Sequence, residues 1–161
     1  MKLRRYRKAD VEGLVALFTA SVHTLAATQY DAEQCRAWAP IPPNIDEWRD
    51  RFGALRTIVA VDDDSYLGFI SFEKNGHIDL LYTAPSAARR GVASALLREA
   101  SVQMSGAART AELFTEASLV AAPFFSRHGF EITEEQNVVR RGVSFRRFAM
   151  RKPGDAAQLR S

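Results

Sequence analysis

The chain has 161 residues and a net charge of +3, and apolar residues make up 47% of it and charged residues 25%. This composition predicts one globular domain and argues against a dedicated nucleic-acid binder, and no apolar run approaches the 18 residues of a membrane span. Cys35 has no partner for an internal disulfide, and the N-terminus has no apolar leader, so we expect a cytoplasmic protein. Three scattered histidines and one cysteine give no metal-ligand spacing.

Hydrophobic periodicity predicts strands and helices in alternation. A strand over 2–6 is followed by a helix with Asp10 as its expected N-cap, and Asp31 is expected to cap a second, shorter helix. Further helices are expected over 46–55, 92–103 and 121–128, and further strands over 57–61, 66–74, 77–83, 110–116, 130–139 and 143–151.

The helix between the strands 77–83 and 110–116 is a crossover, so these two strands should lie parallel and adjacent. The whole pattern predicts an α/β (α+β) fold, with a mixed, mostly antiparallel sheet of six or seven strands and helices on both faces. Asn75-Gly76 is the strongest hairpin signal and favours a type I′ turn. We expect one domain over 1–152 and a flexible polar tail over 153–161.

Asp79 to Arg98 predicts a strand, a basic glycine turn and a helix. The turn at Arg89, Arg90 and Gly91 should present free backbone N–H groups and the positive end of a helix dipole at one point, which suits a phosphate or pyrophosphate. Because Leu80 and Leu81 are adjacent and both apolar, the strand does not alternate cleanly. A β-bulge there would loosen its pairing with the next strand.

Basic residues gather near the C-terminus. One interpretation is that they are solvated outer faces of two strands, and the other is that they attract an anionic ligand. The residues are Arg140, Arg141, Arg146, Arg147, Arg151 and Lys152.

Three local patterns in this order resemble the GNAT superfamily of acyl-CoA-dependent N-acyltransferases. Leu81-Tyr-Thr-x-Pro85 with the following Arg89–Leu97 is similar to the family's acetyl-CoA motif, and Ala122–Phe130 is similar to its helix end with an aromatic residue and Gly-Phe. The third pattern is the pair of helices before the first hairpin. Ala37–Ala39, Arg90–Ser94 and Pro123–Phe125 resemble the YafP-like branch. Ala88 and Ala93 depart from the motif, and Phe125 stands where the family often has a tyrosine general acid.

The resemblance implies acetyl-CoA as the acyl donor. Its pantetheine arm would pair with backbone groups of Leu81, Tyr82 and Thr83, where the family's strands splay apart. Its pyrophosphate would lie on the backbone of Arg89, Arg90, Gly91, Val92, Ala93 and Ser94. Ser118, Phe124 and Phe125 are further expected CoA contacts.

Direct attack of an amine on the thioester needs a base. His77 and Asp79 lie on one face of their strand by its period of two, and both are candidates. Asp79 would take the proton or hold the substrate ammonium, and the alternative is a salt bridge across the sheet. His77 titrates near neutral pH, and its alternative is an idle hairpin residue. Glu73 is a weaker candidate.

Two further groups are needed around the reacting thioester. The backbone N–H of Leu81 or Tyr82 is expected to stabilise the oxyanion. Tyr82, Ser126 or water would replace the tyrosine that is absent at Phe125.

The acceptor should lie against the first two helices and their connection. The uncommon side chains there are His23, Gln29, Tyr30, Cys35 and Trp38. The main hypothesis is acetyl transfer to a primary amine of a small molecule. The alternatives are a non-catalytic acyl-CoA-binding module and an acetyltransferase acting on a protein or aminoacyl-RNA amine. Exposed final strands would also allow a homodimer.

Overall fold

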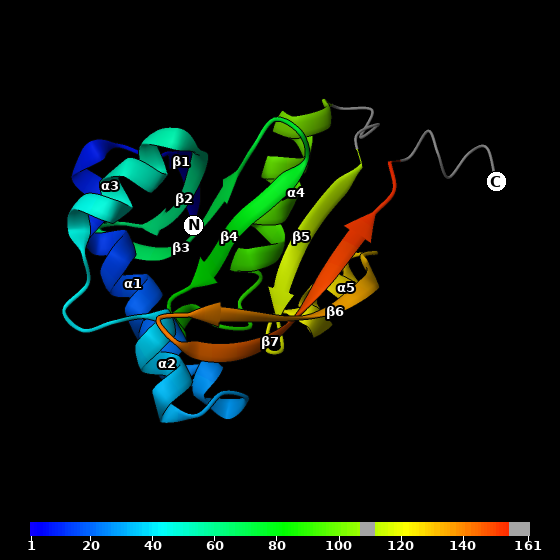
Figure 1. Ribbon diagram of the computed structural model, residues 1–161. Helices are drawn as coiled ribbons and strands as arrows, with labels where there is room; N and C mark the ends of the chain where they lie inside the picture. Colours follow the sequence, from blue (N-terminus) through cyan, green and yellow to red (C-terminus); the bar gives the residue numbers. More distant parts are fainter. Residues whose placement is uncertain (107–111, 155–161) are drawn as a thin grey trace.

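Seven strands form one sheet in the order β1-β2-β3-β4-β5-β7-β6 in the computed structural model, which describes residues 1–106 and 112–154 (Figure 1). All neighbours are antiparallel except β4 and β5, which are parallel as predicted. The predicted strand over 110–116 runs from 113 to 118, and Thr110 lies outside the described residues. The strands are β1 (Lys2–Arg5), β2 (Arg56–Asp62), β3 (Ser65–Phe72), β4 (His77–Thr83), β5 (Leu113–Ser118), β6 (Glu131–Arg140) and β7 (Val143–Lys152).

Helices cover both faces of this sheet, which confirms the predicted fold class. On one face, α1 and α3 bury Leu14, Phe18 and Phe52 against Phe69 and neighbouring strand residues. On the other face, α4 and α5 form a second core around Leu96 and Phe125. The helices are α1 (Val11–Thr24), α2 (Ala32–Trp38), α3 (Ile45–Ala54), α4 (Val92–Ser105) and α5 (Ala122–Arg127).

One helical stretch in the described part, Lys8–Thr28, is long and apolar enough to cross a membrane by length and composition alone. It contains α1, whose Leu14, Val15 and Phe18 are buried in the core. A core helix of a globular domain passes the same test, so this stretch is accounted for by its packing.

Of the two expected helix caps, Asp31 acts as predicted and Asp10 does not. Asp31 Oδ1 accepts from the Gln34 N–H at 2.7 Å. Asp10 precedes α1, but its carboxylate accepts from the Arg7 N–H at 2.7 Å and from the Arg4 guanidinium at 2.8 Å. The Arg4 hydrogen bond is the main reason that the pKa of Asp10 falls to about 2. Asp10 is the last residue of a short 3-10 turn over Lys8–Asp10, and its carboxylate is directed back to the start of that turn instead of to the first turn of α1.

The hairpin between β3 and β4 is not the predicted type I′ turn. That turn needs positive φ at both central residues, and Asn75 is not among the non-glycine residues with positive φ. Instead the Gly76 N–H donates to Glu73 O at 3.2 Å, and Gly76 itself has φ 97°. The connection is a three-residue loop closed by a left-handed glycine. A Cβ on Gly76 would lie 2.2 Å from Glu112 O, so the packing of β5 also requires glycine here.

Candidate active site

The parallel strands β4 and β5 pair only at their first residues. His77 lies opposite Phe114, and Ile78 lies opposite Thr115, whose Oγ1 donates to Ile78 O at 2.8 Å. The register between these two fully described strands ends there. The strands therefore separate after Ile78, as the family resemblance predicts.

A β-bulge in β4 lies at Asp79, one residue before the predicted position. Ser71 of β3 is opposite Leu80, and the next residue, Phe72, is opposite Ile78, so Asp79 is the extra residue. The bulge places both Asp79 and Leu80 on the α1–α3 face, where Asp79 contacts Arg51 and Leu80 is buried. Leu81 packs on the opposite face. The two adjacent leucines are therefore both apolar because the sheet is covered on both faces.

Backbone groups of β4 face the gap at alternate residues. The Ala84 N–H donates to Leu67 O of β3 at 2.8 Å, so alternation turns the N–H and C=O of Thr83 and Leu81 away from β3 and toward β5. Tyr82 lies opposite Phe69 and directs its backbone toward β3. Of the three backbone positions expected to pair with pantetheine, Leu81 and Thr83 are therefore available, whereas Tyr82 can contribute only its side chain.

The turn before α4 has the conformation expected of an anion-binding turn. Arg89 and Gly91 have φ of 63° and 78°, and Gly91 precedes the first helical residue, Val92. The first hydrogen bond at this helix end runs from the Ala95 N–H to Gly91 O at 3.1 Å. The N–H groups of the three preceding residues therefore have no carbonyl one turn earlier in α4. The Arg89 and Arg90 side chains are exposed.

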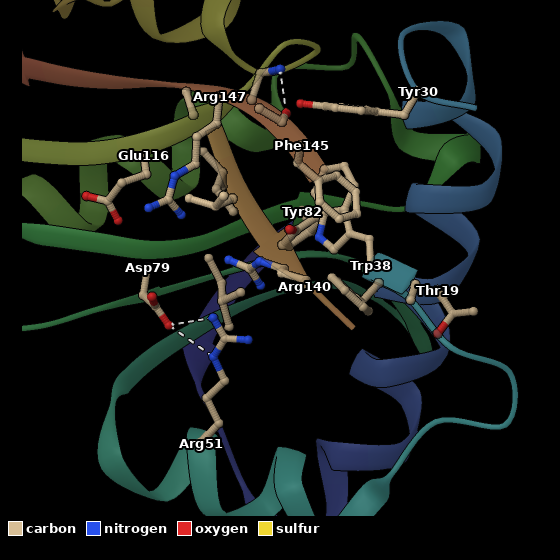
Figure 2. Close-up of a pocket in the computed structure, with 18 of the residues that line it drawn as sticks. Thr19, Tyr30, Trp38, Arg51, Asp79, Tyr82, Glu116, Arg140, Phe145 and Arg147 are labelled. Carbon is tan, nitrogen blue, oxygen red and sulfur yellow. Dashed lines mark hydrogen bonds and ion pairs between the residues drawn. The ribbon is translucent and has the colours of Figure 1, made fainter. Parts of the chain in front are cut away.

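A cavity of about 510 Å³ lies at the gap and opens mainly on the α1–α3 face (Figure 2). Helices α1 to α3, strands β4 and β5 and the β6–β7 hairpin contribute to its wall, and Phe125 of α5 reaches it from the other face. Part of the wall is aromatic: the Phe18 and Tyr82 ring centroids lie 4.8 Å apart, and Trp38 and Tyr82 lie 6.4 Å apart. The polar part comes mainly from carboxylates and guanidinium groups, which gives an amine substrate charged partners.

His77 is held between two carboxylates. Its Nδ1 lies 2.8 Å from Glu73 Oε1, and its Nε2 lies 2.8 Å from Glu116 Oε1 of β5. The Glu116 hydrogen bond is the main cause that raises the pKa of His77 to about 9. An imidazolium at neutral pH has no free lone pair to accept a proton. This arrangement therefore disfavours His77 as the general base, and it is not an idle hairpin residue either.

Asp79 lies in the cavity wall and is paired with Arg51 of α3. Arg51 Nε and Nη2 both donate to Asp79 Oδ2, at 3.1 and 3.0 Å (Figure 2). The predicted salt bridge of Asp79 thus exists, although it joins the sheet to a helix rather than crossing the sheet. Among the described residues, none hydrogen-bonds to the other oxygen, Oδ1, so the pairing leaves it available to an amine in the cavity.

The Tyr82 hydroxyl points into the cavity (Figure 2). Burial raises the pKa of Tyr82 to about 12, so the phenol keeps its proton throughout the neutral range. A protonated phenol can donate to a leaving thiolate, which is the role of the tyrosine that the family motif would place at position 125. Phe125 is buried between Phe124 and Phe130 and has no hydroxyl.

Of the five side chains expected on the acceptor side, two line the cavity and three, including Gln29, do not. Tyr30 and Trp38 line the cavity, and Tyr30 also fixes its wall, because the Tyr30 hydroxyl donates to Arg146 O at 2.7 Å and accepts from the Leu119 N–H at 3.0 Å. His23 and Cys35 do not line it. His23 Nε2 lies 2.8 Å from Ala39 O and joins α1 to the end of α2. The Cys35 thiol is buried, and burial raises its pKa.

Two other expected CoA contacts have structural roles of their own. Ser118 lines the cavity, and its Oγ accepts from the Ala121 N–H at 3.0 Å before α5. Phe124 stacks against His128, with ring centroids 4.3 Å apart. His128 Nε2 in turn lies 3.0 Å from Ser94 Oγ in the first turn of α4. The end of α5 is thereby attached to the predicted phosphate site.

Three charged residues of the cavity were missed in the sequence. Glu47 and Arg51 lie in α3, and Glu116 lies in β5. Their positions become visible only when strands and helices from separate parts of the chain meet. The basic cluster near the C-terminus was the one sequence signal for Arg140.

The fold and the gap define an acyltransferase of the GNAT type. The Acetyltransferase (GNAT) domain family matches residues 26–152, and the chain belongs to this family. It is a GNAT N-acetyltransferase.

Its sequence is 36% identical over 151 residues to the Escherichia coli K12 protein described as the uncharacterized N-acetyltransferase YafP, covering 94% of this chain and 95% of that one. A GCN5-related N-acetyltransferase from Rhodopseudomonas palustris has a similar structure, with a TM-score of 0.87, 30% identity and 94% of each chain covered. The fold is also that of the PaiA N-acetyltransferase from Thermoplasma acidophilum, solved in complex with coenzyme A, at a TM-score of 0.74 and 19% identity over 94% of this chain and 98% of that one.

Proposed function

We propose that this protein transfers the acetyl group of acetyl-CoA to a primary amine of a small molecule, by direct attack of the amine on the thioester. The observation that carries this proposal is the opening between β4 and β5. On one side of it lies the turn that begins α4, and on the other lies a cavity that contains the Asp79 carboxylate. Donor and acceptor can therefore approach the gap from opposite faces of the sheet.

The donor would be held mainly by backbone groups. Leu81 and Thr83 direct N–H and C=O groups into the gap, where an amide-containing pantetheine arm would pair as a strand does. Val92, Ala93 and Ser94 present N–H groups to the pyrophosphate. The replacements Ala88 and Ala93 are compatible with this role, because their side chains are not needed for it.

The reaction needs three groups of the chain. Asp79 takes a proton from the substrate ammonium and later passes it to solvent, and the freed lone pair forms the C–N bond; the nitrogen loses its second proton to solvent as the intermediate collapses. The Leu81 N–H donates to the oxyanion of the tetrahedral intermediate. When the C–S bond breaks, the Tyr82 hydroxyl gives its proton to the thiolate, and solvent returns a proton to Tyr82. The products are the N-acetylated amine and CoA.

The size and wall of the cavity support a small acceptor. About 510 Å³ lies within the range of small-molecule sites, and aromatic side chains surround a few charged groups. Tyr30, Trp38 and Phe145 pack against one another there, with centroid distances between 5.3 and 6.3 Å.

Release of CoA from acetyl-CoA, measured across a panel of primary amines with mass spectrometry of the products, tests this function. Asp79→Asn should lower kcat by about 10²-fold or more, the usual contribution of a general base. Asp46→Asn is the matched control, because Asp46 is an exposed residue of α3 outside the cavity. Absence of acetyl transfer to any amine would overturn the proposal, and equal rates for the two variants would remove Asp79 from it.

A further inference from the structure

Guanidinium groups outnumber carboxylates in the cavity wall. Five arginines line it against three carboxylates, and two of those carboxylates are already paired: Asp79 with Arg51 and Glu116 with His77. Arg146 forms an ion pair with Glu135, with its Nε 2.6 Å from Glu135 Oε1, and the Arg141 guanidinium donates a hydrogen bond to Ala37 O. Positive charge that is paired with no carboxylate in the described part of the chain therefore remains on the β6–β7 side.

That charge belongs chiefly to Arg140 at the end of β6. Within residues 1–106 and 112–154, Arg140 has no side-chain hydrogen bond and no ion pair. Figure 2 shows its guanidinium directed into the cavity toward the Tyr82 hydroxyl. Desolvation lowers the pKa of Arg140; Tyr82 and Asp79 oppose this decrease, whereas the nearby cations Arg51 and Arg147 add to it. An arginine remains protonated even so.

Arg147 and Arg51 each keep donors for a ligand. Arg147 Nε donates a hydrogen bond to Gln136 Oε1 at 2.9 Å, and Arg51 Nε and Nη2 donate to the Asp79 carboxylate. The remaining Nη groups of both residues have no partner among the described residues.

The position of Arg140 is fixed by the neighbouring turn. Arg141, the next residue, donates to Ala37 O of α2, and Gln34 Nε2 of the same helix donates to Ser144 O at 3.0 Å. These bonds hold the hairpin against α2 on the acceptor side of the sheet. The predicted pyrophosphate turn belongs to α4, which packs on the opposite face. The phosphates of CoA therefore do not account for these arginines.

We propose that the acceptor amine carries a second, anionic group, a carboxylate or a phosphate, and that Arg140 binds this group while Asp79 faces the amine. Planar guanidinium donors match both oxyanions and bind them in pairs of hydrogen bonds. This inference rests on the proposed function for the amine, but the anion site exists independently of turnover.

The test compares matched amines: amino acids against their carboxamides, and O-phosphoethanolamine against ethanolamine. In each pair, the anionic member, which is the amino acid or O-phosphoethanolamine, should have a higher kcat/KM than its uncharged counterpart. Arg140→Gln should raise KM for that member by about tenfold or more, the effect of losing one charge-assisted hydrogen bond, and should change KM for the uncharged member much less. Arg140→Lys should recover part of the loss. Arg151→Gln removes the same charge from an exposed pair with Glu112 outside the cavity and should behave as the parent protein does.

A binding measurement separates this proposal from the proposed function. Titration calorimetry with N-acetylated amino acids and with O-phosphoethanolamine should give weaker binding to Arg140→Gln than to Arg151→Gln, even if no amine is acetylated. Preference for the acid or for the phosphate identifies the anion. Equal use of charged and uncharged amines, equal binding by the two variants or no binding of either probe would overturn the proposal.

Discussion

His77 Nε2 of β4 lies 2.8 Å from Glu116 Oε1 of β5, directly beside the last residues through which the two strands pair. On its other side, Nδ1 lies 2.8 Å from Glu73 Oε1. This ion pair closes the paired end of the gap and makes the imidazole a cation. Its contribution is to the geometry of the opening, and the proposed reaction therefore assigns the proton acceptor to Asp79.

The ion pairs of His77 should make stability depend on pH. The pKa of His77 is about 9 in the folded protein and about 6.5 when unfolded, so its stabilisation is complete below about 6.5 and is lost as the pH rises through 9. We expect His77→Gln to lower the free energy of unfolding by about 1 kcal/mol near pH 6, because both carboxylates are partly exposed.

Urea unfolding of the parent and His77→Gln proteins at a series of pH values measures this difference. It should shrink toward zero above about pH 9. A difference that stays constant from about pH 6 to pH 10 would mean that His77 is not protonated in the folded protein.

Removal of the Tyr82 hydroxyl should slow the reaction without loosening donor binding. Tyr82→Phe keeps the ring packing with Phe18 and Trp38 and removes only the proton donor. We expect kcat to fall by about 10²-fold with little change in KM for acetyl-CoA. Tyr6→Phe is the control, because Tyr6 stacks on Phe52 outside the cavity. Equal kcat values for the two variants would assign the proton transfer to water.

A negative charge in the first turn of α4 should affect stability and CoA binding in opposite directions. Ala93→Asp places a carboxylate near the positive end of the helix dipole and should raise stability by about 0.3–1 kcal/mol. The same carboxylate would repel the pyrophosphate and should weaken CoA binding roughly tenfold. Calorimetry with CoA and thermal unfolding without it measure both effects, with Ala93→Gln as the neutral control. Unchanged CoA affinity would exclude this turn as the pyrophosphate site.

Two glycine substitutions should have opposite effects on stability. Gly76→Ala combines φ 97° with a Cβ only 2.2 Å from Glu112 O, and we expect a loss of about 2–4 kcal/mol. Gly53→Ala lies in α3 with no atom within 4 Å of the new Cβ and should gain about 0.5–1 kcal/mol. Urea unfolding compares them. A small effect at Gly76 would show that β5 can move away from the hairpin.

The sequence determined the order of elements, because periodicity and turn residues act locally. It predicted that β4 and β5 are parallel, since the helix between them requires a crossover. It also indicated the glycine turn before α4, where backbone conformation alone creates the expected anion site. The hairpin type was predicted incorrectly because the loop has three residues and Asn75 does not take a positive φ; the approach of Glu112, a distant residue, explains only why position 76 must be glycine.

Only the tertiary structure decided the charge state and partners of the polar residues. Asp79 meets Arg51 from α3, and His77 meets Glu116 from β5, and neither pairing leaves a local trace in the sequence. His23 and Cys35 looked suitable for a binding site, but the packing of α1 against α2 directs them away from the cavity. Arg140 was recognised only as part of a basic cluster, and the attachment of its hairpin to α2 turns it into the cavity. Electrostatic interactions act through space, so their partners are set by the fold rather than by neighbouring residues in the chain.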